Sequence, residues 1–320
     1  MHPALSVIFF TTLSGAGYGL LAWLGISLAL LHSRSDVMPA MHALQLWALG
    51  LGLALATVGL LSSLVHLGQP QRAWRALSQW RTSWLSREGV LALLTMLPAL
   101  AIGALLLLSR PLSADIATTL GLLGMLLAVL ALATVACTAM IYASLVPIPA
   151  WRHPLVVPVY LLFALLTGLA VLLTLMFGLF PSAGEVMPMV ATLATLAGVL
   201  VIAKWLYWRD IHRTPLPATR GAAVGLPGRD VQVFERPITE GNYITREMAF
   251  VVARRHALRL RILSSVLLFG VPLLAWLLAV FVAVPSVFVL ALVASGLLVG
   301  AFVERWLFFA EARHMVTLYY

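Results

Sequence analysis

The chain has 320 residues, of which 62% are hydrophobic and only 10% are charged. A soluble protein carries roughly a quarter charged residues, so this composition excludes an ordinary soluble protein and predicts one that exposes apolar surface to lipid. The net charge of +9 would suit nucleic-acid binding, but the arginines lie between apolar runs, which is typical of membrane topology. The single cysteine, Cys137, excludes an iron–sulfur cluster or zinc site built by this chain alone, because both need several ligands.

Eight apolar runs reach the length of about 20 residues that a helix needs to cross a bilayer. They show no apolar/polar alternation, which argues against the strands of a membrane barrel. The predicted spans are 6–32, 41–66, 88–109, 115–145, 154–180, 186–208, 261–284 and 286–309. We therefore expect one all-helical integral membrane domain over residues 1–320. A Ser-Leu-Val…Pro…Ala-Trp-Arg motif follows both the second and the fourth span, which allows a division into two four-helix halves.

The first span contains Ser14-Gly-Ala-Gly-Tyr-Gly, in which Gly15 and Gly19 form a small-xxx-small pair. Such pairs let two helix backbones approach closely. The alternative is that these glycines make room for a flat ligand ring against the first helix.

The connection 69–86 predicts an amphipathic helix lying in the membrane interface. Its apolar residues fall within about 120° of arc at about 100° per residue. They are Trp74, Leu77, Trp80 and Trp84. Tryptophan favours headgroup depth in such helices. Arg81 falls inside the apolar arc, so it either snorkels to water or reaches beneath the helix toward a partner such as Glu88.

Residues 209–260 form the longest polar segment. It begins with several prolines and glycines, which favour extended chain, and becomes helical in character around 245–260. About fifty residues do not build a substantial core alone, so the segment is either a loop on anionic lipid or a docking surface for a partner. We favour docking, with Arg246, Arg254 and Arg255 as contacts, joined by Arg152 from the connection after the fourth span.

The distribution of positive charge predicts the orientation. With eight spans, both termini share one side with the second, fourth and sixth connections. That side carries 18 of the 20 Lys and Arg residues, and Arg34 and Arg110 lie on the other. The positive-inside rule then predicts a multi-pass protein of a bacterial inner membrane with cytoplasmic termini. This orientation does not depend on the long loop. Without its ten arginines, the two sides still carry 8 and 2 Lys and Arg residues.

Polar groups inside the spans are few. No Asp or Glu lies near mid-span, which disfavours a proton pump or an ion-coupled transporter. Lys204 and the Glu304-Arg305 pair lie near cytoplasmic span ends, where they can snorkel or pair. A membrane haem would need facing histidines, and only His32 with His42, or His2 with His66, suggests such a pair. Haem is therefore not expected.

His66 and Glu88 are the strongest candidates for chemistry, since they end adjacent spans at one depth. A quinone needs donors to two carbonyl oxygens and two protons for each reduction. A histidine donates or accepts near neutral pH, and a partly desolvated carboxylate holds a proton in the same range. The alternative is a helix-end histidine and an Arg87/Glu88 pair that caps the third span.

Four segments of the chain together form a specific pattern. They are His2-Pro-Ala-Leu-Ser-Val-Ile-Phe-Phe-Thr-Thr-Leu-Ser-Gly-Ala-Gly-Tyr-Gly, Ser63-Leu-Val-His-Leu-Gly-Gln-Pro…Ala-Trp-Arg, Ser78-Gln-Trp-Arg-Thr-Ser-Trp-Leu-Ser-Arg-Glu and Tyr142-Ala-Ser-Leu. On these segments the chain resembles, along most of its length, the membrane anchor subunit of the dimethyl sulfoxide reductase family, a quinone-linked anchor with eight helices. The resemblance implies an iron–sulfur partner subunit, a molybdopterin catalytic subunit and quinone exchange beside His66 and Glu88. It implies no haem in this chain.

The predicted cytoplasmic face departs from the outward-facing dimethyl sulfoxide reductases and is similar to cytoplasmic sulfite dehydrogenases. We therefore expect electrons to run from sulfite, through the iron–sulfur subunit, to ubiquinone or menaquinone. Besides His66 and Glu88, the expected quinone-site residues are Tyr18 as a pocket wall and three arginines that steer electrostatics, Arg72, Arg81 and Arg87. One alternative is the reverse direction, quinol oxidation for a dimethyl sulfoxide-type reductase. The other is a membrane scaffold or transporter with no redox role.

Overall fold

The computed structural model of the chain describes residues 4–34, 37–65, 67–109, 113–180, 187–235, 252–282 and 286–319. Within these residues every regular element is a helix, and no strand occurs. Eight of the helices are long and apolar enough to cross a membrane. The prediction of an all-helical protein with eight spans is confirmed.

The spanning helices agree with the predicted runs to within a few residues. They are α1 (Leu5–Leu31), α3 (His42–Leu64), α4 (Trp84–Leu108), α5 (Ala114–Ala143), α6 (Val156–Leu179), α7 (Met187–Ile211), the continuous α10 (Val252–Ser265), η2 (Val266–Gly270) and α11 (Val271–Phe281), and α12 (Val287–Ala310). The short elements are α2 (Val37–Ala40), η1 (Pro70–Gln79), α8 (Arg220–Ala223) and η3 (Met315–Leu318).

Serine residues fix where several spans begin. Helix α4 starts four residues before the predicted Glu88, because the Ser83 side chain accepts a hydrogen bond from the Ser86 amide (3.5 Å). Ser113 and Ser286 cap α5 and α12 in the same way. A serine at this position satisfies one of the four amides that a helix start leaves without a partner. The early start of α4 places Glu88 inside the span.

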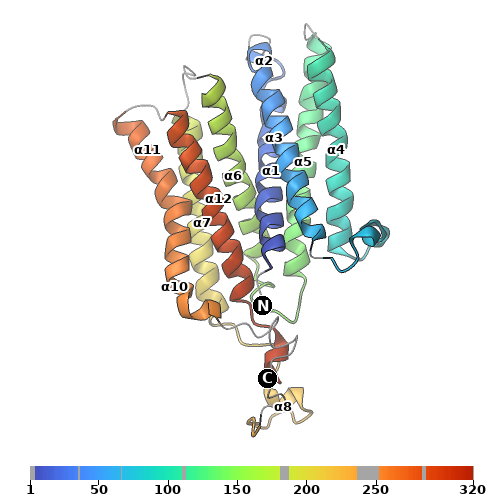
Figure 1. Cartoon of the computed structure of the whole chain (residues 1–320), viewed down its shortest axis with the longest axis vertical. Helices are drawn as coiled ribbons and strands as arrows, with labels where there is room; N and C mark the ends of the chain where they lie inside the picture. The colour runs from blue at the N-terminus through green and yellow to red at the C-terminus, as the bar shows by residue number, and fades with distance from the viewer. Residues whose placement is uncertain are drawn as a thin grey trace.

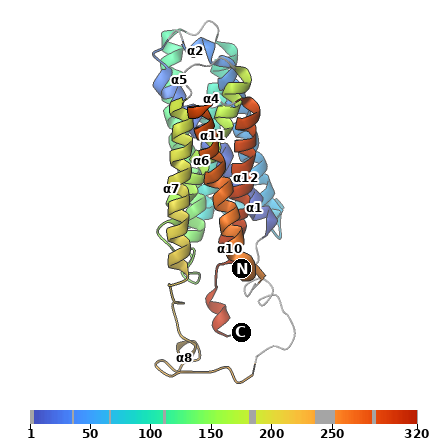
Figure 2. The same cartoon turned by 90° about the vertical axis from the view of Figure 1, so that its left-hand side faces the viewer.

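Both termini lie at the same end of the bundle, together with η1 and α8, whereas α2 lies at the opposite end (Figures 1 and 2). We call the end that carries the termini the terminal face. It contains residues 67–83, 144–155, 212–235 and 311–319. This arrangement is the one that an even number of spans requires.

Helix α1 is the centre of the bundle and packs against α3, α5, α6 and α12. The glycines of its Gly-Ala-Gly-Tyr-Gly run make these contacts close. A Cβ added to Gly19 would lie 1.7 Å from the Ala164 carbonyl oxygen on α6, and one added to Gly17 would lie 2.4 Å from the Ala56 nitrogen on α3. A Cβ added to Gly15 would meet nothing within 4 Å. Helix packing therefore accounts for Gly19, while Gly15 faces open space.

The first four spans contact the last four mainly through α1 and α6, with further contacts between α5 and α6, α1 and α12, and α3 and α6. Within the first set α1 packs on α3 and α5, and α4 packs on α5; within the second α6 packs on α7 and α12, and α7 packs on α11. Gly168 of α6 faces Gly19, with a Cβ added to Gly168 only 2.2 Å from the Gly19 carbonyl carbon. The chain thus forms two four-helix groups that meet along a glycine-lined backbone contact.

The connection 69–86 differs from its prediction. Residues 70–79 form the 3-10 helix η1 rather than an α-helix, and Trp84 already belongs to α4. A 3-10 helix has about three residues per turn, so residues three apart share a face. Trp74 and Trp80 are 68% and 52% exposed, whereas Leu77 is half-buried. The exposed tryptophans suit headgroup depth, although the helix type was predicted wrongly.

The segment 209–260 is shorter as a loop than predicted. Residues 209–211 complete α7, residues 252–260 belong to α10, and residues 236–251 lie outside the described part of the chain. The described portion is held at the terminal face by the C-terminal segment, since the Tyr319 hydroxyl donates to the Ala223 carbonyl (3.0 Å). The Met315 amide likewise donates to the Pro147 carbonyl (3.0 Å).

Candidate functional site

Glu88 lies in the second turn of α4 and is only 4% exposed. Its Oε1 accepts a hydrogen bond from the Thr138 hydroxyl of α5. Thr138 is buried as well. A buried carboxyl group needs such a partner, because an unpaired charge inside the protein is costly. The site candidate is thus enclosed between α4 and α5 rather than exposed at the helix end.

The 3-10 helix η1 covers the α4 end that carries Glu88. The Ser86 hydroxyl donates to the Ala76 carbonyl, and the half-buried Leu77 packs against Gly89. Arg87 closes the turn between the two elements, donating to the Trp80 carbonyl (3.0 Å) and to the Arg81 carbonyl (2.7 Å). Arg87 therefore binds the backbone of the turn, and an Arg87/Glu88 capping pair does not describe its role.

The other arginines of this segment are exposed. Arg81 is exposed and lies over the Trp80 ring at 5.5 Å, so it stacks at the surface rather than reaching beneath the helix. Arg72 is exposed too. Arginine–tryptophan stacking of this kind suits the boundary between lipid headgroups and water.

Tyr18 of α1 is 1% exposed, and its hydroxyl has no hydrogen-bond partner among the described residues. Tyr18 and Glu88 are thus both buried, and the role of Tyr18 as a pocket wall stays a prediction.

For several of the predicted site residues, the structure gives no geometry that tests the predicted role. His66 and Arg246 lie outside the described residues, and the side chains of Arg254 and Arg255 on α10 are likewise not described. Arg152 is exposed at the terminal face, as a docking residue must be. The roles predicted for these residues stay predictions.

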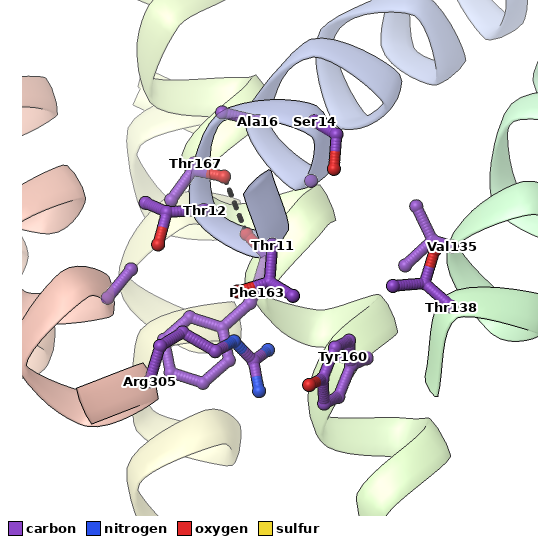
Figure 3. A pocket seen from close by; sticks show the side chains of 12 residues that line it. Thr11, Thr12, Ser14, Ala16, Val135, Thr138, Tyr160, Phe163, Thr167 and Arg305 are labelled. Atoms are coloured by element: carbon purple, nitrogen blue, oxygen red, sulfur yellow. Dashed lines mark hydrogen bonds between the residues drawn. The ribbon is translucent and has the colours of Figure 1, made fainter. Parts of the chain in front are cut away.

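A small cavity lies beside Thr138, between α1, α5, α6 and α12 (Figure 3). It leaves about 10 Å³ for the centre of a water molecule. Three buried polar atoms at its wall have no hydrogen-bond partner among the described residues: Thr12 Oγ1, Tyr160 Oη and Arg305 Nη1. Figure 3 shows the Arg305 guanidinium and the Tyr160 ring turned toward one another on the side away from Ser14. Polar atoms of this kind are normally satisfied by protein or by ordered water.

A buried ion cluster adjoins this cavity. Lys204 of α7 forms an ion pair with Glu304 of α12, with 2% and 0% of their side chains exposed. Arg305 Nη1 lies 3.6 Å from Glu304 Oε2, and the guanidinium lies 3.5 Å from the centre of the Tyr160 ring. Lys204 and Glu304 are more than one turn inside their helices, at a depth of about 10 Å. The sequence allowed them to snorkel or to pair, and they pair.

Two histidines, His153 and His212, lie at the terminal face above this cluster. His153 lies 3.5 Å from Asp210, and its ring packs edge-on against Tyr207 at 5.4 Å. Burial lowers the pKa of His153 in spite of the Asp210 charge. Arg261 donates to His212 Nε2 (2.6 Å) and to Glu311 (2.6 Å). Burial and then the Arg261 charge lower the pKa of His212, so its ring is kept neutral as the acceptor.

The predicted absence of haem is not decided by the geometry. His32 Nδ1 bonds to the Ala29 carbonyl (2.8 Å), and His42 Nε2 bonds to the Leu106 carbonyl (2.7 Å). Among the described residues no group of three or more metal-binding side chains occurs.

Comparison with known proteins decides the family. Residues 1–310 match the family described as DMSO reductase anchor subunit (DmsC). The chain belongs to this anchor family. It is also 35% identical over 337 residues to a subunit of the sulfite dehydrogenase of Allochromatium vinosum, an alignment that covers 100% of this chain and 99% of that protein. The family predicted from the sequence motifs is confirmed.

Membership establishes the coarse role of this anchor. It is a multi-pass membrane subunit of an oxidoreductase complex, and such a complex implies catalytic and electron-transfer partners. The sequence singled out Glu88 and Tyr18, whose roles stay predictions, and it did not single out the buried polar residues Thr138 and Tyr160 or the contacts of Arg305. One feature of the sequence does point to this region. Glu304 and Arg305 lie more than one turn inside an apolar run, where burying a charge costs free energy.

Proposed function

We propose that this anchor is the quinone-reactive subunit of a molybdopterin and iron–sulfur complex that oxidises sulfite at the cytoplasmic face of a bacterial inner membrane. The observation that carries the proposal is Glu88, a buried carboxyl group near the terminal face that is held by the Thr138 hydroxyl. The likeness to a sulfite dehydrogenase subunit supports sulfite as the electron source.

The residues around Glu88 fit a quinone headgroup chemically. Ubiquinone or menaquinone, when bound, would supply the electron acceptor of the complex. Thr138 occupies Glu88 Oε1, so the second oxygen is left to hold a proton for delivery. Tyr18 offers a buried hydroxyl without a partner among the described residues, and His66 would donate to one carbonyl oxygen. Glu88 would act as proton donor and His66 as a positioning group.

The terminal face suits partner docking. The predicted contact Arg152 is exposed at this face, whereas the contacts predicted for Arg246, Arg254 and Arg255 stay predictions. Positive charge on one face steers an acidic partner into place and fixes its register. An iron–sulfur subunit bound here would lie on the same side as Glu88, which keeps electron donor and proton donor close to one headgroup.

The proposal predicts sulfite-dependent quinone reduction by the purified complex. We expect a short-chain ubiquinone or menaquinone analogue to be reduced when sulfite is added, and the activity to be lost when this anchor is removed. The measurement is quinone absorbance, with sulfite oxidation by a soluble acceptor dye as control. A complex that reduces the dye but no quinone in the presence of the anchor contradicts the proposal.

Orientation gives an independent prediction. A fluorescent reporter that folds only in the cytoplasm should fluoresce when it is fused after Tyr320, whereas insertion after Ser113, between α4 and α5, should give no signal. The reason is the excess of arginine at the terminal face. Fluorescence from the second fusion alone would place the termini outside and overturn the cytoplasmic assignment.

The family description favours a second candidate function, in which the anchor oxidises quinol for a dimethyl sulfoxide-type reductase. The same residues would then accept protons instead of donating them. The substrate of the co-purifying catalytic subunit separates the two directions. Membership in an anchor family disfavours the alternative of a transporter without redox role.

A further inference from the structure

Glu88 has to be resupplied with protons if it delivers them, and this inference rests on the proposed function. On the side of the terminal face, η1 packs on the start of α4 and Arg87 bonds to the turn before it, while Glu88 itself is only 4% exposed. The side-chain contact described for Glu88 is Thr138, on the inner side. The route to water therefore has to be sought behind Thr138.

Thr138 lines the small cavity, and Thr12, Tyr160 and Arg305 are among the other polar residues of its wall. All four side chains are at least nine-tenths buried. The atoms without partners, Thr12 Oγ1, Tyr160 Oη and Arg305 Nη1, offer the two to four hydrogen bonds that a buried water needs. The space of about 10 Å³ is the size of one such water and far too small for a quinone ring.

Tyr160 and Arg305 also line a second small cavity, together with Lys204 and Tyr207. Tyr160 and Arg305 therefore form a single layer of side chains between Thr138 and the Lys204–Glu304 ion pair. Tyr207 in turn contacts His153, which lies next to Asp210 at the terminal face. Polar groups thus follow one another from the terminal face to Glu88, along α6, α7 and α12.

Lys204 is the sole lysine among 20 basic residues, the other 19 being arginine. Apart from its histidines, the chain thus has one basic side chain that can release its proton, since an arginine does not do so in proteins. That lysine is buried with a carboxylate instead of lying at the surface. A buried ion pair adds little stability compared with well-packed apolar residues, so stability alone is a weak reason for it.

We propose that Lys204, Glu304, Tyr160 and one cavity water form a one-sided proton path that resupplies Glu88 from the terminal face. Glu88 takes a proton through the Thr138 hydroxyl and the water, the Tyr160 hydroxyl replaces it, and the Lys204–Glu304 pair restores Tyr160. Lys204 then regains a proton from the face. Each broken O–H or N–H bond is formed again at the same group, and no electron moves. Arg305 keeps its proton and positions the water and Glu304.

The decisive variant is Lys204→Arg, which keeps the positive charge and the pair with Glu304 but removes the releasable proton. We expect quinone reduction by sulfite to fall by about 100-fold, the size of a lost proton-transfer step, and its solvent deuterium isotope effect to rise. Sulfite oxidation with a soluble acceptor should stay unchanged. Lys204→Arg activity within twofold of wild type, in an intact complex, would overturn the path.

A second variant and a second readout test the path even if an arginine does not fit at position 204. Glu304→Gln should lower quinone reduction in the same way, and Thr174→Val, a change at a half-buried position of α6 away from the path, serves as control. Thermal melting of the complex reports folding. Infrared spectroscopy of the Glu88 carboxyl band, assigned with Glu88→Gln, should show slow exchange into D2O in both path variants. Exchange as fast as in wild type contradicts the path.

These readouts keep the two proposals apart. A wild-type complex that reduces no quinone defeats the proposed function, yet the exchange rate of the Glu88 carboxyl still tests the path. A wild-type complex that reduces quinone, together with unaffected path variants, defeats the path alone.

Discussion

Glu88→Gln is expected to lower quinone reduction by the complex by at least about 100-fold while sulfite oxidation with a soluble acceptor persists. Glutamine has nearly the same shape, and its carbonyl oxygen can still accept the hydrogen bond from Thr138, so packing between α4 and α5 is kept. What is lost is the proton that the carboxyl group holds and delivers. The two rates are measured on the same purified complex, with a quinone analogue and with an acceptor dye.

The control for this variant is Asp115→Asn, the same carboxyl-to-amide change at an exposed position in the first turn of α5, at the end opposite the terminal face. It should leave both rates within twofold of wild type. Equal loss of both rates in Glu88→Gln would indicate failed assembly rather than chemistry. Retention of quinone reduction would remove Glu88 from the site.

The spans were predictable because each is set by a local quantity, the length of an apolar run. Their starts were less so: the predicted third span began at Glu88, yet Ser83 caps the helix and brings Trp84 inside it. The connection 69–86 was expected as an α-helix because its apolar residues also fit a period of 3.6. Trp74, Leu77 and Trp80 are three residues apart, a spacing that suits a 3-10 helix equally well.

The candidate site was predictable from the sequence only in part, because a local pattern does not show which side chains will become partners. Glu88 and Tyr18 stand out in the sequence as polar groups in apolar surroundings. The partner of Glu88 does not, because Thr138 is one of many threonines in the spans, and most of these bond to their own helix. The pairing of Lys204 with Glu304 joins residues 100 positions apart, which no local pattern encodes.

The glycines of α1 show where a local motif is ambiguous and packing decides. Gly15 and Gly19 have the same spacing motif and were predicted alike, either to pack helices or to make room for a ring. In the fold Gly19 touches the α6 backbone and Gly15 touches nothing within 4 Å. Gly15 lines the cavity beside Thr138, which has room for one water but not for a ring, so this cavity does not support the ring alternative.

Gly19→Ala is expected to have the largest effect on assembly. Its Cβ would lie 1.7 Å from the Ala164 oxygen and 2.5 Å from the Ala164 carbonyl carbon, so the α1 and α6 backbones would have to separate. Overpacking in a core costs about 1–3 kcal/mol, and more where backbone rather than a flexible side chain must move. Because this contact joins the two four-helix groups, we expect most of the intact anchor to be lost. Fluorescence-detected gel filtration of a reporter-tagged anchor in detergent measures the intact fraction.

Gly50→Ala on α3 is the matched control for Gly19→Ala, since a Cβ there would meet nothing within 4 Å and the residue is exposed. It should leave the intact fraction unchanged, because alanine costs nothing in a helix relative to glycine. Gly168→Ala, on the α6 side of the same contact, should fail like Gly19→Ala, because its Cβ would lie 2.2 Å from the Gly19 carbonyl carbon. A normal intact fraction for either contact variant would mean that α1 and α6 are not in backbone contact, and the division into two groups joined by these glycines would fall with it.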